Sequence, residues 1–459
     1  MLPVLVLTTC MLLVASLPLW VPKGIVALRM RLFAHIDGDE GIPIPGDLVD
    51  ATHFKEVYSH PAANGRSRGA RLSDLFWYWL SPGAEIHQEH LEPGDRYEEI
   101  ARSTRRVLAT PRAEAEALAA RCSARTLSSI RGVRLVRLRD LMMPVWAEFY
   151  YEVVFGERCP PQARTLIVGN ADDVVTALKC CGLRHMDRRD RLTRFLIDRL
   201  EAGGLPHQLP SGLSTRERAL YLQGTFLNTA IVQTSEAMAH LLMVLAQHPE
   251  TQAQALRDDH YLDRVIEETF RLYPLFGIAH RITSREIAVS NGVTLPAGSV
   301  LRFNYPAFHR AGFDDTDRFD PSRWEAFPAR EANHIPFGVA SNRPCPAWRL
   351  APITMRVAAR ETLKRFALYS SASHTRSMPN RGPCLLVPRD GRRGPRLAPL
   401  AYVWLRDRWE DLARSVVQLV LGTYMVWDAR RQRLCERYFE AQDQDSGAAD
   451  HLPAAADGQ

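Results

Sequence analysis

The chain has 459 residues, of which 46% are hydrophobic and 24% are charged, a composition ordinary for a globular protein that can bury a large core. Its 58 basic and 52 acidic residues leave a net charge of +6, an excess too small to indicate nucleic acid as a partner but sufficient for a basic face that meets an acidic protein or anionic lipid. The eight cysteines form neither a disulfide framework nor a paired C-x-x-C metal motif, which fits reduced, cytosol-facing thiols.

The N-terminal segment Leu2–Val21 is uncharged and mostly apolar. About 20 such residues can span a bilayer. No basic residue precedes the segment, whereas Lys23, Arg29 and Arg31 follow it. We therefore predict a transmembrane anchor at residues 1–22, with the rest of the chain on the cytoplasmic side. The competing interpretation is a secretory signal cleaved near residues 14–16.

Residues 35–90 have the pattern of short strands and turns around an aromatic cluster, Phe76–Trp79, which we expect in the core. His87, Glu89 and His90 follow closely in sequence. Their spacing matches neither a helical H-E-x-x-H motif nor a zinc finger, so a solvated loop is the favoured interpretation.

Helical patterns cover residues 96–108, 141–155, 187–202 and 215–246. A further helix is expected to end near Pro274. On that helix Glu268 and Arg271 are three residues apart and share one face. The apolar surroundings favour a buried pair that needs another partner, and Arg323 is the candidate. Between these segments, residues 281–300 are typical of short β-hairpins with glycine at the turns.

Cys345 lies between Pro344 and Pro346, two residues after Arg343. Prolines fix φ and remove N–H donors, so this is a stiff loop that presents one sulfur. A thiolate held in this way can ligate haem iron, and a nearby cation can keep it deprotonated and pair with a haem propionate. The alternative is a buried structural thiol in a proline-rich turn.

After the region of these motifs, residues 404–440 form an amphipathic helical pattern that includes the apolar run Val416–Trp427. This run is too short to span a bilayer, so we expect it to pack on the body, a partner or a membrane surface. The polar tail from about residue 443 is expected to be disordered.

The ordered set of motifs resembles the cytochrome P-450 family. It comprises E-T-F-R at 268–271, D-P-S-R-W at 320–324 and F-G-V-A-S-N-R-P-C at 337–345. The resemblance covers about residues 90–390. It implies a mainly α fold with small β-sheets (α+β), a haem domain at 23–400, an additional C-terminal helical extension at 401–442 and a tail at 443–459. Two departures are a cysteine loop one residue longer than the family pattern, and Ala347 where the family has glycine.

The resemblance also implies the site residues. Cys345 would be the axial ligand of haem b, beside Phe337, which opens the loop. Arg343 and Arg281 would hold the propionates. Arg105 is a further propionate candidate, since the family supplies an arginine from the corresponding helix.

On the long helix at 215–246, the family's oxygen-binding motif A-G-x-[DE]-T-T corresponds to residues 229–234. Ala230 replaces the glycine and Val232 replaces the acid. Gln233 and Thr234 are left as an amide–alcohol pair, so no carboxylate is supplied for proton delivery. Glu236 is expected on another side of the helix.

Three functions remain open. The first is monooxygenation of a small apolar molecule with O2 (hydroxylation, epoxidation or oxidative coupling), in specialised metabolism. It would use electrons from a ferredoxin and its reductase or from a flavoprotein reductase. The second is haem-thiolate chemistry without O2 activation, as in a peroxygenase that uses peroxide, an isomerase or a dehydratase. The third is a non-catalytic haem-binding or scaffold protein.

Overall fold

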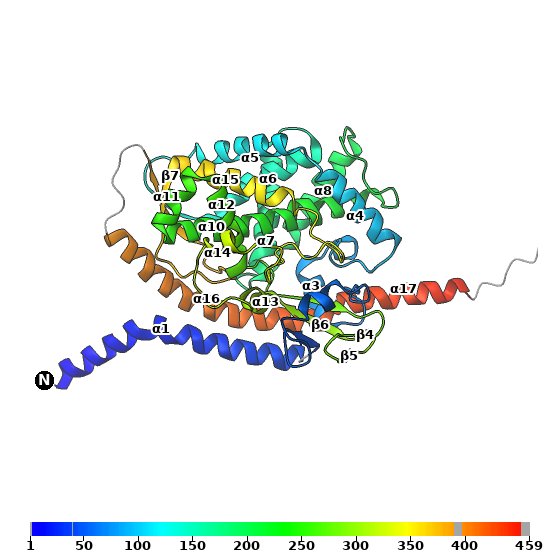
Figure 1. The fold of residues 1–459 in the computed structure, drawn as a ribbon, viewed down its shortest axis with the longest axis horizontal. Coiled ribbons are helices and arrows are strands. Elements are labelled where there is room, and N and C mark those ends of the chain that lie inside the picture. Colours follow the sequence, from blue (N-terminus) through cyan, green and yellow to red (C-terminus); the bar gives the residue numbers. More distant parts are fainter. Residues whose placement is uncertain (1, 39, 390–396, 451–459) are drawn as a thin grey trace, which may run out of the picture.

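Helices make up most of the structure, as the sequence predicts (Figure 1). The computed structural model describes every residue except 1, 39, 390–396 and 451–459. The helices of the first half are α1 (Leu2–Asp37), α2 (Phe54–Ser59), α3 (Arg71–Leu80), η1 (Ala84–Ile86), α4 (Asp95–Val107), α5 (Arg112–Leu127), α6 (Leu138–Phe155), α7 (Pro161–Leu178), α8 (Met186–Glu201) and α9 (Thr215–Gly224). Those of the second half are η2 (Thr225–Ala230), α10 (Ile231–Gln247), α11 (Pro249–Arg257), α12 (Asp259–Leu272), α13 (Tyr305–Arg310), α14 (Arg323–Ala326), α15 (Leu350–Arg365), α16 (Leu397–Gln432) and α17 (Leu434–Asp450).

The strands of the described residues form small sheets at the edge of the helical body. One sheet has the order β1-β6-β3, a second has the order β2-β8-β7, and β4 pairs with β5. In the first sheet β6 runs antiparallel to β3, which agrees with the hairpins predicted at 281–300. On its other side β6 runs parallel to β1. The strands are β1 (Ile42–Ile44), β2 (Arg134–Arg137), β3 (Ile278–Ile282), β4 (Ile287–Ala288), β5 (Thr294–Leu295), β6 (Val300–Asn304), β7 (Phe366–Tyr369) and β8 (Pro383–Pro388).

The core is built around α10, which continues α9 and η2 in one unbroken helical run. Helices α6, α12 and α15 pack against it and contribute to the same apolar cluster. The run Thr215–Gln247 is long and apolar enough to cross a membrane, but 83% of its most apolar stretch is buried within the protein. It is therefore a core helix, and protein covers most of its apolar surface.

The region 35–90 differs from the prediction of strands and turns. Among its described residues β1 is the one strand, and the aromatic cluster Phe76–Trp79 belongs to helix α3. Trp77, Tyr78 and Trp79 are buried, but against α16 and α17 rather than within the main core. The Tyr78 hydroxyl donates to Asp428 Oδ2 of α16 at 2.9 Å.

The N-terminal helix α1 and the C-terminal helix α16 lie side by side on one side of the body. Helix α1 continues through Pro18 and Pro22 beyond the predicted boundary at residue 22, and Figure 1 shows it bent along its length. Its second half lies beside α16. Helix α17 runs past the predicted start of the tail at residue 443. The rest of that tail, residues 451–459, lies outside the described residues.

Candidate active site

The predicted buried network on α12 is present. Glu268 and Arg271 are both fully buried, and the carboxylate accepts from Arg271 Nε at 2.8 Å and from Arg271 Nη2 at 2.9 Å. Arg323 Nε donates to Glu268 Oε1 at 3.0 Å, which confirms the expected third member. Trp324 Nε1 and the backbone N–H of Asp320 also donate hydrogen bonds to the Glu268 carboxylate. A buried charge satisfied in this way ties α12 to the segment that leads into the cysteine loop.

The loop that carries Cys345 folds as a short hairpin. Val339 bridges Asn342, and the Cys345 N–H donates to the Phe337 carbonyl at 2.9 Å. Gly338 and Arg343 both have left-handed backbones, with φ of 74° and 51°. The extra residue of this loop is accommodated by these two reversals, one of them at a non-glycine residue where such a conformation costs about 1–3 kcal/mol.

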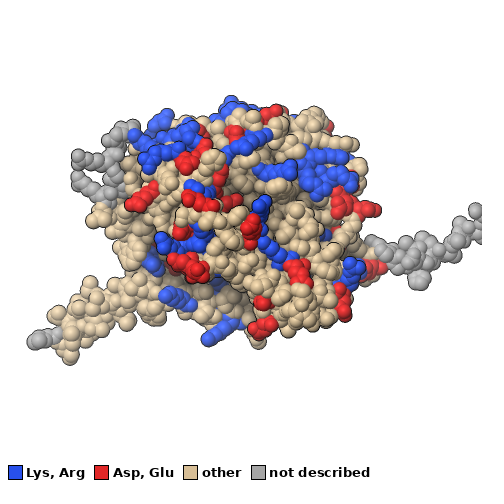
Figure 2. All heavy atoms as spheres, in the orientation of Figure 1, with Lys and Arg blue, Asp and Glu red and all other residues tan. Residues whose placement is uncertain are grey.

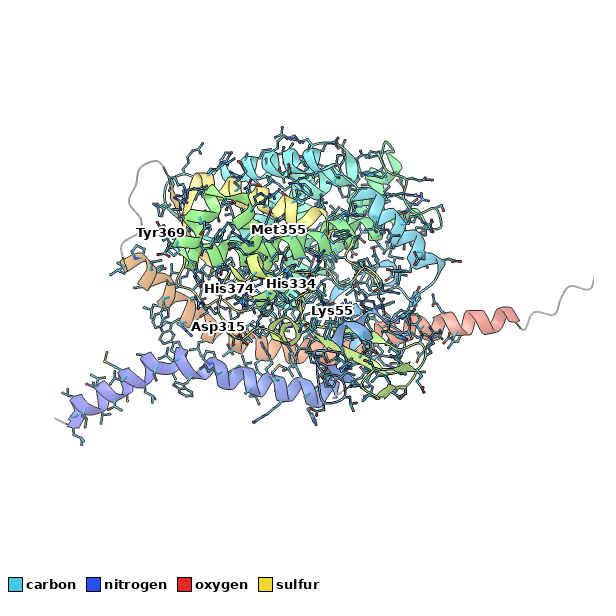
Figure 3. All side chains as sticks on the ribbon, in the orientation of Figure 1. Lys55, Asp315, His334, Met355, Tyr369 and His374 are labelled. Carbon is cyan, nitrogen blue, oxygen red and sulfur yellow. The ribbon has the colours of Figure 1, made fainter. Side chains whose placement is uncertain are left out.

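The Cys345 thiol faces a cavity of about 1190 Å³, part of it open to solvent. The lining combines the thiol with many apolar and a few polar side chains, which is the character of a small-molecule site. The wall opposite the loop comes from η2 and α10, and Met355 of α15 (Figure 3) lines the side of the thiol. Much of the lining is apolar, including Phe226, Ala230, Ala237, Phe270, Phe337 and Met355.

Burial, rather than the neighbouring arginine, dominates the acidity of the Cys345 thiol. Burial raises the pKa of Cys345 to about 11, although a hydrogen bond from the Ala347 N–H opposes the shift. The charge of Glu89 raises the pKa further. Formation of the thiolate would therefore depend on a bound metal ion, which deprotonates a coordinating thiol outright.

Two arginines reach the cavity with nitrogens that lack a protein partner. Arg343 donates through Nη1 to the Leu91 carbonyl at 2.7 Å and lies over the Tyr97 ring, while its buried Nη2 has no partner. Arg66 also lines the cavity, and its buried Nε has none. Burial and the charge of Arg66 lower the pKa of Arg343 to about 10. Two adjacent buried cations with free donors provide a site for anionic groups.

Arg281 and Arg105 lie elsewhere than the family pattern suggests. Arg281 is fully buried, but its guanidinium donates to the backbone carbonyls of Tyr58 and Asn342, and it does not line the cavity. It fastens β3 to the cysteine loop. Arg105 is exposed on α4 and is likewise absent from the lining. The buried Nε of Arg281 lacks a partner, as that of Arg66 does. Arg66, a coil residue that no local motif distinguishes, is thus a further candidate to hold an anionic group, and it lines the cavity.

The wall opposite Cys345 carries the predicted amide–alcohol pair, since Gln233 and Thr234 both line the cavity. The Thr234 hydroxyl donates to the Ala230 carbonyl at 2.6 Å, so the Tyr150 hydroxyl, 3.1 Å away, donates to Thr234. The preceding turn, Thr225–Ala230, is a π-helix, a distortion frequent at functional sites. Glu236 points away from the cavity, as expected, and pairs with Arg139 and Lys179.

The prediction of a solvated loop around His87 was wrong. His87 and His90 are only 6% and 7% exposed, and His87 and Glu89 line the cavity. Glu89 lies 3.4 Å from Arg66 Nη2. His87 Nδ1 accepts from the Glu89 N–H, so Nε2 carries the proton and donates to Thr229 Oγ1 at 2.9 Å. The local sequence is polar, and only the tertiary fold places it inside.

These residues fit a flat, apolar macrocycle with two carboxylates. The thiol would meet the metal, and the unpartnered donors of Arg66 and Arg343 would meet the carboxylates. The small side chain of Ala347 stands where the family has glycine and also lines the cavity. Haem b has this chemistry, so the donor set of the cavity matches the cofactor that the family pattern implies.

Comparison with known proteins agrees with this geometry. A family model described as cytochrome P450 matches residues 183–392. A putative cytochrome P450 135B1 of Mycobacterium tuberculosis is 30% identical over 173 residues, 35% of this chain and 36% of that protein. A cyclooctat-9-en-7-ol 5-monooxygenase of Streptomyces melanosporofaciens is 30% identical over 141 residues, 26% of this chain and 30% of that protein. The matched stretch thus spans about a third of these curated relatives.

Solved structures show the same fold at lower identity. A six-coordinated cytochrome P450 from Thermus thermophilus has a TM-score of 0.57 at 19% identity, covering 71% of this chain and 88% of that chain. Cytochrome P450SP alpha in complex with ibuprofen has a TM-score of 0.61 at 16% identity, covering 74% of this chain and 89% of that chain.

Proposed function

Because the chain belongs to the cytochrome P450 family, whose members bind haem b through a cysteine thiolate, we propose that it is a haem-thiolate oxidoreductase with Cys345 as the axial ligand. One observation carries the proposal. The Cys345 thiol and the unpartnered nitrogens of Arg66 and Arg343 face one largely apolar cavity. Phe337 packs edge-on against Phe270, with 5.5 Å between the ring centroids, and this contact holds the start of the loop at the same cavity.

The proposed reaction is monooxygenation of a small apolar molecule, as in specialised metabolism. The haem supplies the oxidising chemistry when it is bound, and the protein supplies orientation and electrostatics. The apolar lining suits an apolar substrate. Gln233 and Thr234 would orient water or a substrate hydroxyl on the side opposite Cys345. The electrons would come from a ferredoxin with its reductase or from a flavoprotein reductase.

A second function is favoured by one observation at α10. The carboxylate of that helix nearest the amide–alcohol pair, Glu236, is held by Arg139 and Lys179 outside the cavity. Without an acid from this helix, a peroxide-driven or an isomerase-type reaction is the alternative. A non-catalytic haem-binding protein is the third possibility.

We also propose that α1 anchors the protein in a membrane with its catalytic body in the cytoplasm. The helix has a mean hydropathy of 2.3 in its most apolar stretch, and only 6% of that stretch is buried. Figure 2 shows its N-terminal end projecting from the body without charged side chains. In a full-length Leu5→Arg/Leu12→Arg variant, charge in the span should make the protein extractable from membranes by alkaline carbonate. Retention equal to that of the native chain would refute the anchor.

The haem proposal is tested by the spectrum of the reduced protein with carbon monoxide. The native chain should show the Soret band of a thiolate ligand, and Cys345→Ala should lose it. Cys181→Ala is the matched control, because Cys181 is a free, half-buried cysteine that does not line the cavity. Loss of the band in the control alone, or no haem uptake by the native chain, would contradict the assignment.

The reaction type is tested by product formation from a panel of apolar molecules. One arm contains O2 with a reduced electron-transfer partner, and the other contains peroxide alone. A strict requirement for the reduced partner supports monooxygenation. Turnover with peroxide alone supports the peroxygenase, and rearrangement or dehydration of an oxygenated substrate without either supports the isomerase or dehydratase. Haem uptake without turnover in any arm would support a non-catalytic role.

A further inference from the structure

Helix α16 carries an exposed apolar stripe along its outer side. The members recur at spacings of three, four or seven residues, which places them on one side of the helix. They are Leu405, Trp409, Val416, Val420, Tyr424 and Trp427, between 39% and 61% exposed. An apolar surface of this extent on a soluble face marks an interaction site.

The orientation of this stripe is fixed by the opposite face of α16. Asp407 accepts from the Ser373 N–H at 2.7 Å and from Asn380 Nδ2 at 3.0 Å, and both Asp407 and Asp428 are buried. Met425 is buried against α3. Rotation of the helix to hide the stripe would break these hydrogen bonds and expose Met425, so the apolar face stays outward.

The neighbour of the stripe indicates what covers it. The second half of α1 lies beside α16, where Phe33 of α1 reaches Gly422 so closely that an added Cβ would lie 2.8 Å from the Phe33 ring. On that half of α1, Val26, Leu28 and Met30 are exposed, at 38%, 47% and 57%. Exposed apolar side chains therefore occur on both of these adjacent helices, and they continue along the N-terminal part of α1.

We propose that α16 lies in the plane of a lipid bilayer surface, with this stripe inserted into the boundary between headgroups and acyl chains. A protein partner or a second copy could cover α16 but would leave the apolar N-terminal part of α1 in water, whereas one bilayer covers both. Trp409, Tyr424 and Trp427 have the amphipathic rings that favour this boundary. The stretch 415–427 carries no charged residue, and Arg406 and Arg431 bracket the stripe with exposed cationic groups.

This arrangement gives the protein two independent membrane contacts. The bend of α1, a helix that contains Pro18 and Pro22, lets its N-terminal part leave the plane while its second half stays beside α16. The body would then keep one orientation to the membrane, which a single flexible span does not impose.

The test uses full-length chains in which the span of α1 is disabled by Leu5→Arg/Leu12→Arg, so that only α16 and the second half of α1 remain to bind. Flotation with vesicles of phosphatidylcholine and phosphatidylglycerol should recover this parent. Adding Val416→Glu/Val420→Glu should lower its partition coefficient by about tenfold or more. Adding Val133→Glu, at an exposed valine outside both helices, should not. Far-UV circular dichroism and the haem spectrum, measured on every variant, should be unchanged.

Two results would overturn the proposal. One is flotation of the parent that is absent or insensitive to Val416→Glu/Val420→Glu. The other is conversion of a dimer to a monomer by the same substitutions, with vesicle binding unchanged, because the stripe would then be an interface between copies. Failure of haem binding in Cys345→Ala has no bearing on flotation, so this inference and the proposed function are tested separately.

Discussion

Replacing Glu268 by alanine removes the centre of the buried network. The carboxylate is fully buried and balances Arg271, which is also fully buried, and Arg323, which is 13% exposed. Without it, the Arg271 guanidinium keeps the carbonyls of Thr316 and Arg318 but has no negative partner. Breaking a buried pair from one side costs about 3–5 kcal/mol, a large part of a total stability of roughly 5–15 kcal/mol. We therefore expect Glu268→Ala to lower the free energy of unfolding by about 3–5 kcal/mol.

The measurement is urea unfolding followed by circular dichroism, with the ratio of haem to protein as a second reading. Glu325→Ala is the control. Glu325 lies on the same small helix as Arg323 and pairs with Arg264, but its side chain is 56% exposed. Its loss should cost about 1 kcal/mol or less. The double variant Glu268→Ala/Arg271→Ala should be less destabilised than the sum of the single variants, because it removes the stranded charge. Equal effects of Glu268→Ala and Glu325→Ala would refute the reasoning.

Other predictions concern pH, cofactor binding and helix capping. Burial lowers the pKa of His374 (Figure 3) to about 2 and that of His240 to about 3, so both are neutral in the folded chain, whereas in the unfolded chain they take up protons below about pH 6.5. The free energy of unfolding should therefore fall as the pH drops below about 6.5. For His374→Phe, the slope of this free energy against pH should be shallower by up to about 1.4 kcal/mol per pH unit. A slope identical to that of the native chain would contradict this prediction. Arg66→Gln should weaken haem binding in a titration and have little effect on unfolding of the haem-free chain. Arg281→Gln should instead destabilise the haem-free chain. Weaker haem binding in Arg281→Gln and a less stable haem-free chain in Arg66→Gln would favour Arg281 as the propionate ligand. Ser214→Ala removes the capping box of α9 and should lower the free energy of unfolding in urea by about 1 kcal/mol. An unchanged free energy of unfolding would contradict the capping role.

The parts of the site that sequence reasoning located are those whose chemistry is local. Glu268 and Arg271 share a helical face because they are three residues apart. Cys345 and Arg343 share one short loop, stiffened by prolines. In these cases the pattern and the contact lie within a few residues, so the sequence could predict the contact without a tertiary fold.

The parts that it missed depend on chain segments far apart in sequence. Arg281 lies in a family-like motif, yet its guanidinium is taken up by a carbonyl near the start of the chain, that of Tyr58, and by the cysteine loop. Arg66 lies in a coil without any motif and reaches the cavity only through the tertiary fold. Three of residues 76–79 are buried, as expected, but the sequence did not indicate that the C-terminal extension is among their partners. Local periodicity contains no information on such partners.

The polar groups opposite Cys345 limit where a proton for catalysis can come from. Among the described residues that line the cavity, Glu89 is the one carboxylic acid. Burial disfavours its charged form, but the charge of Arg66, together with those of Arg343 and Arg281, outweighs that effect and lowers the pKa of Glu89. It is therefore ionised at neutral pH and holds no proton to give.

The Gln233 amide can only orient water, and the Thr234 hydroxyl is committed to the Ala230 carbonyl. A net proton must then arrive from solvent through the open side of the cavity or from the substrate itself. A peroxide-driven reaction brings its own protons, which is why the comparison of O2 with peroxide decides between the two leading functions.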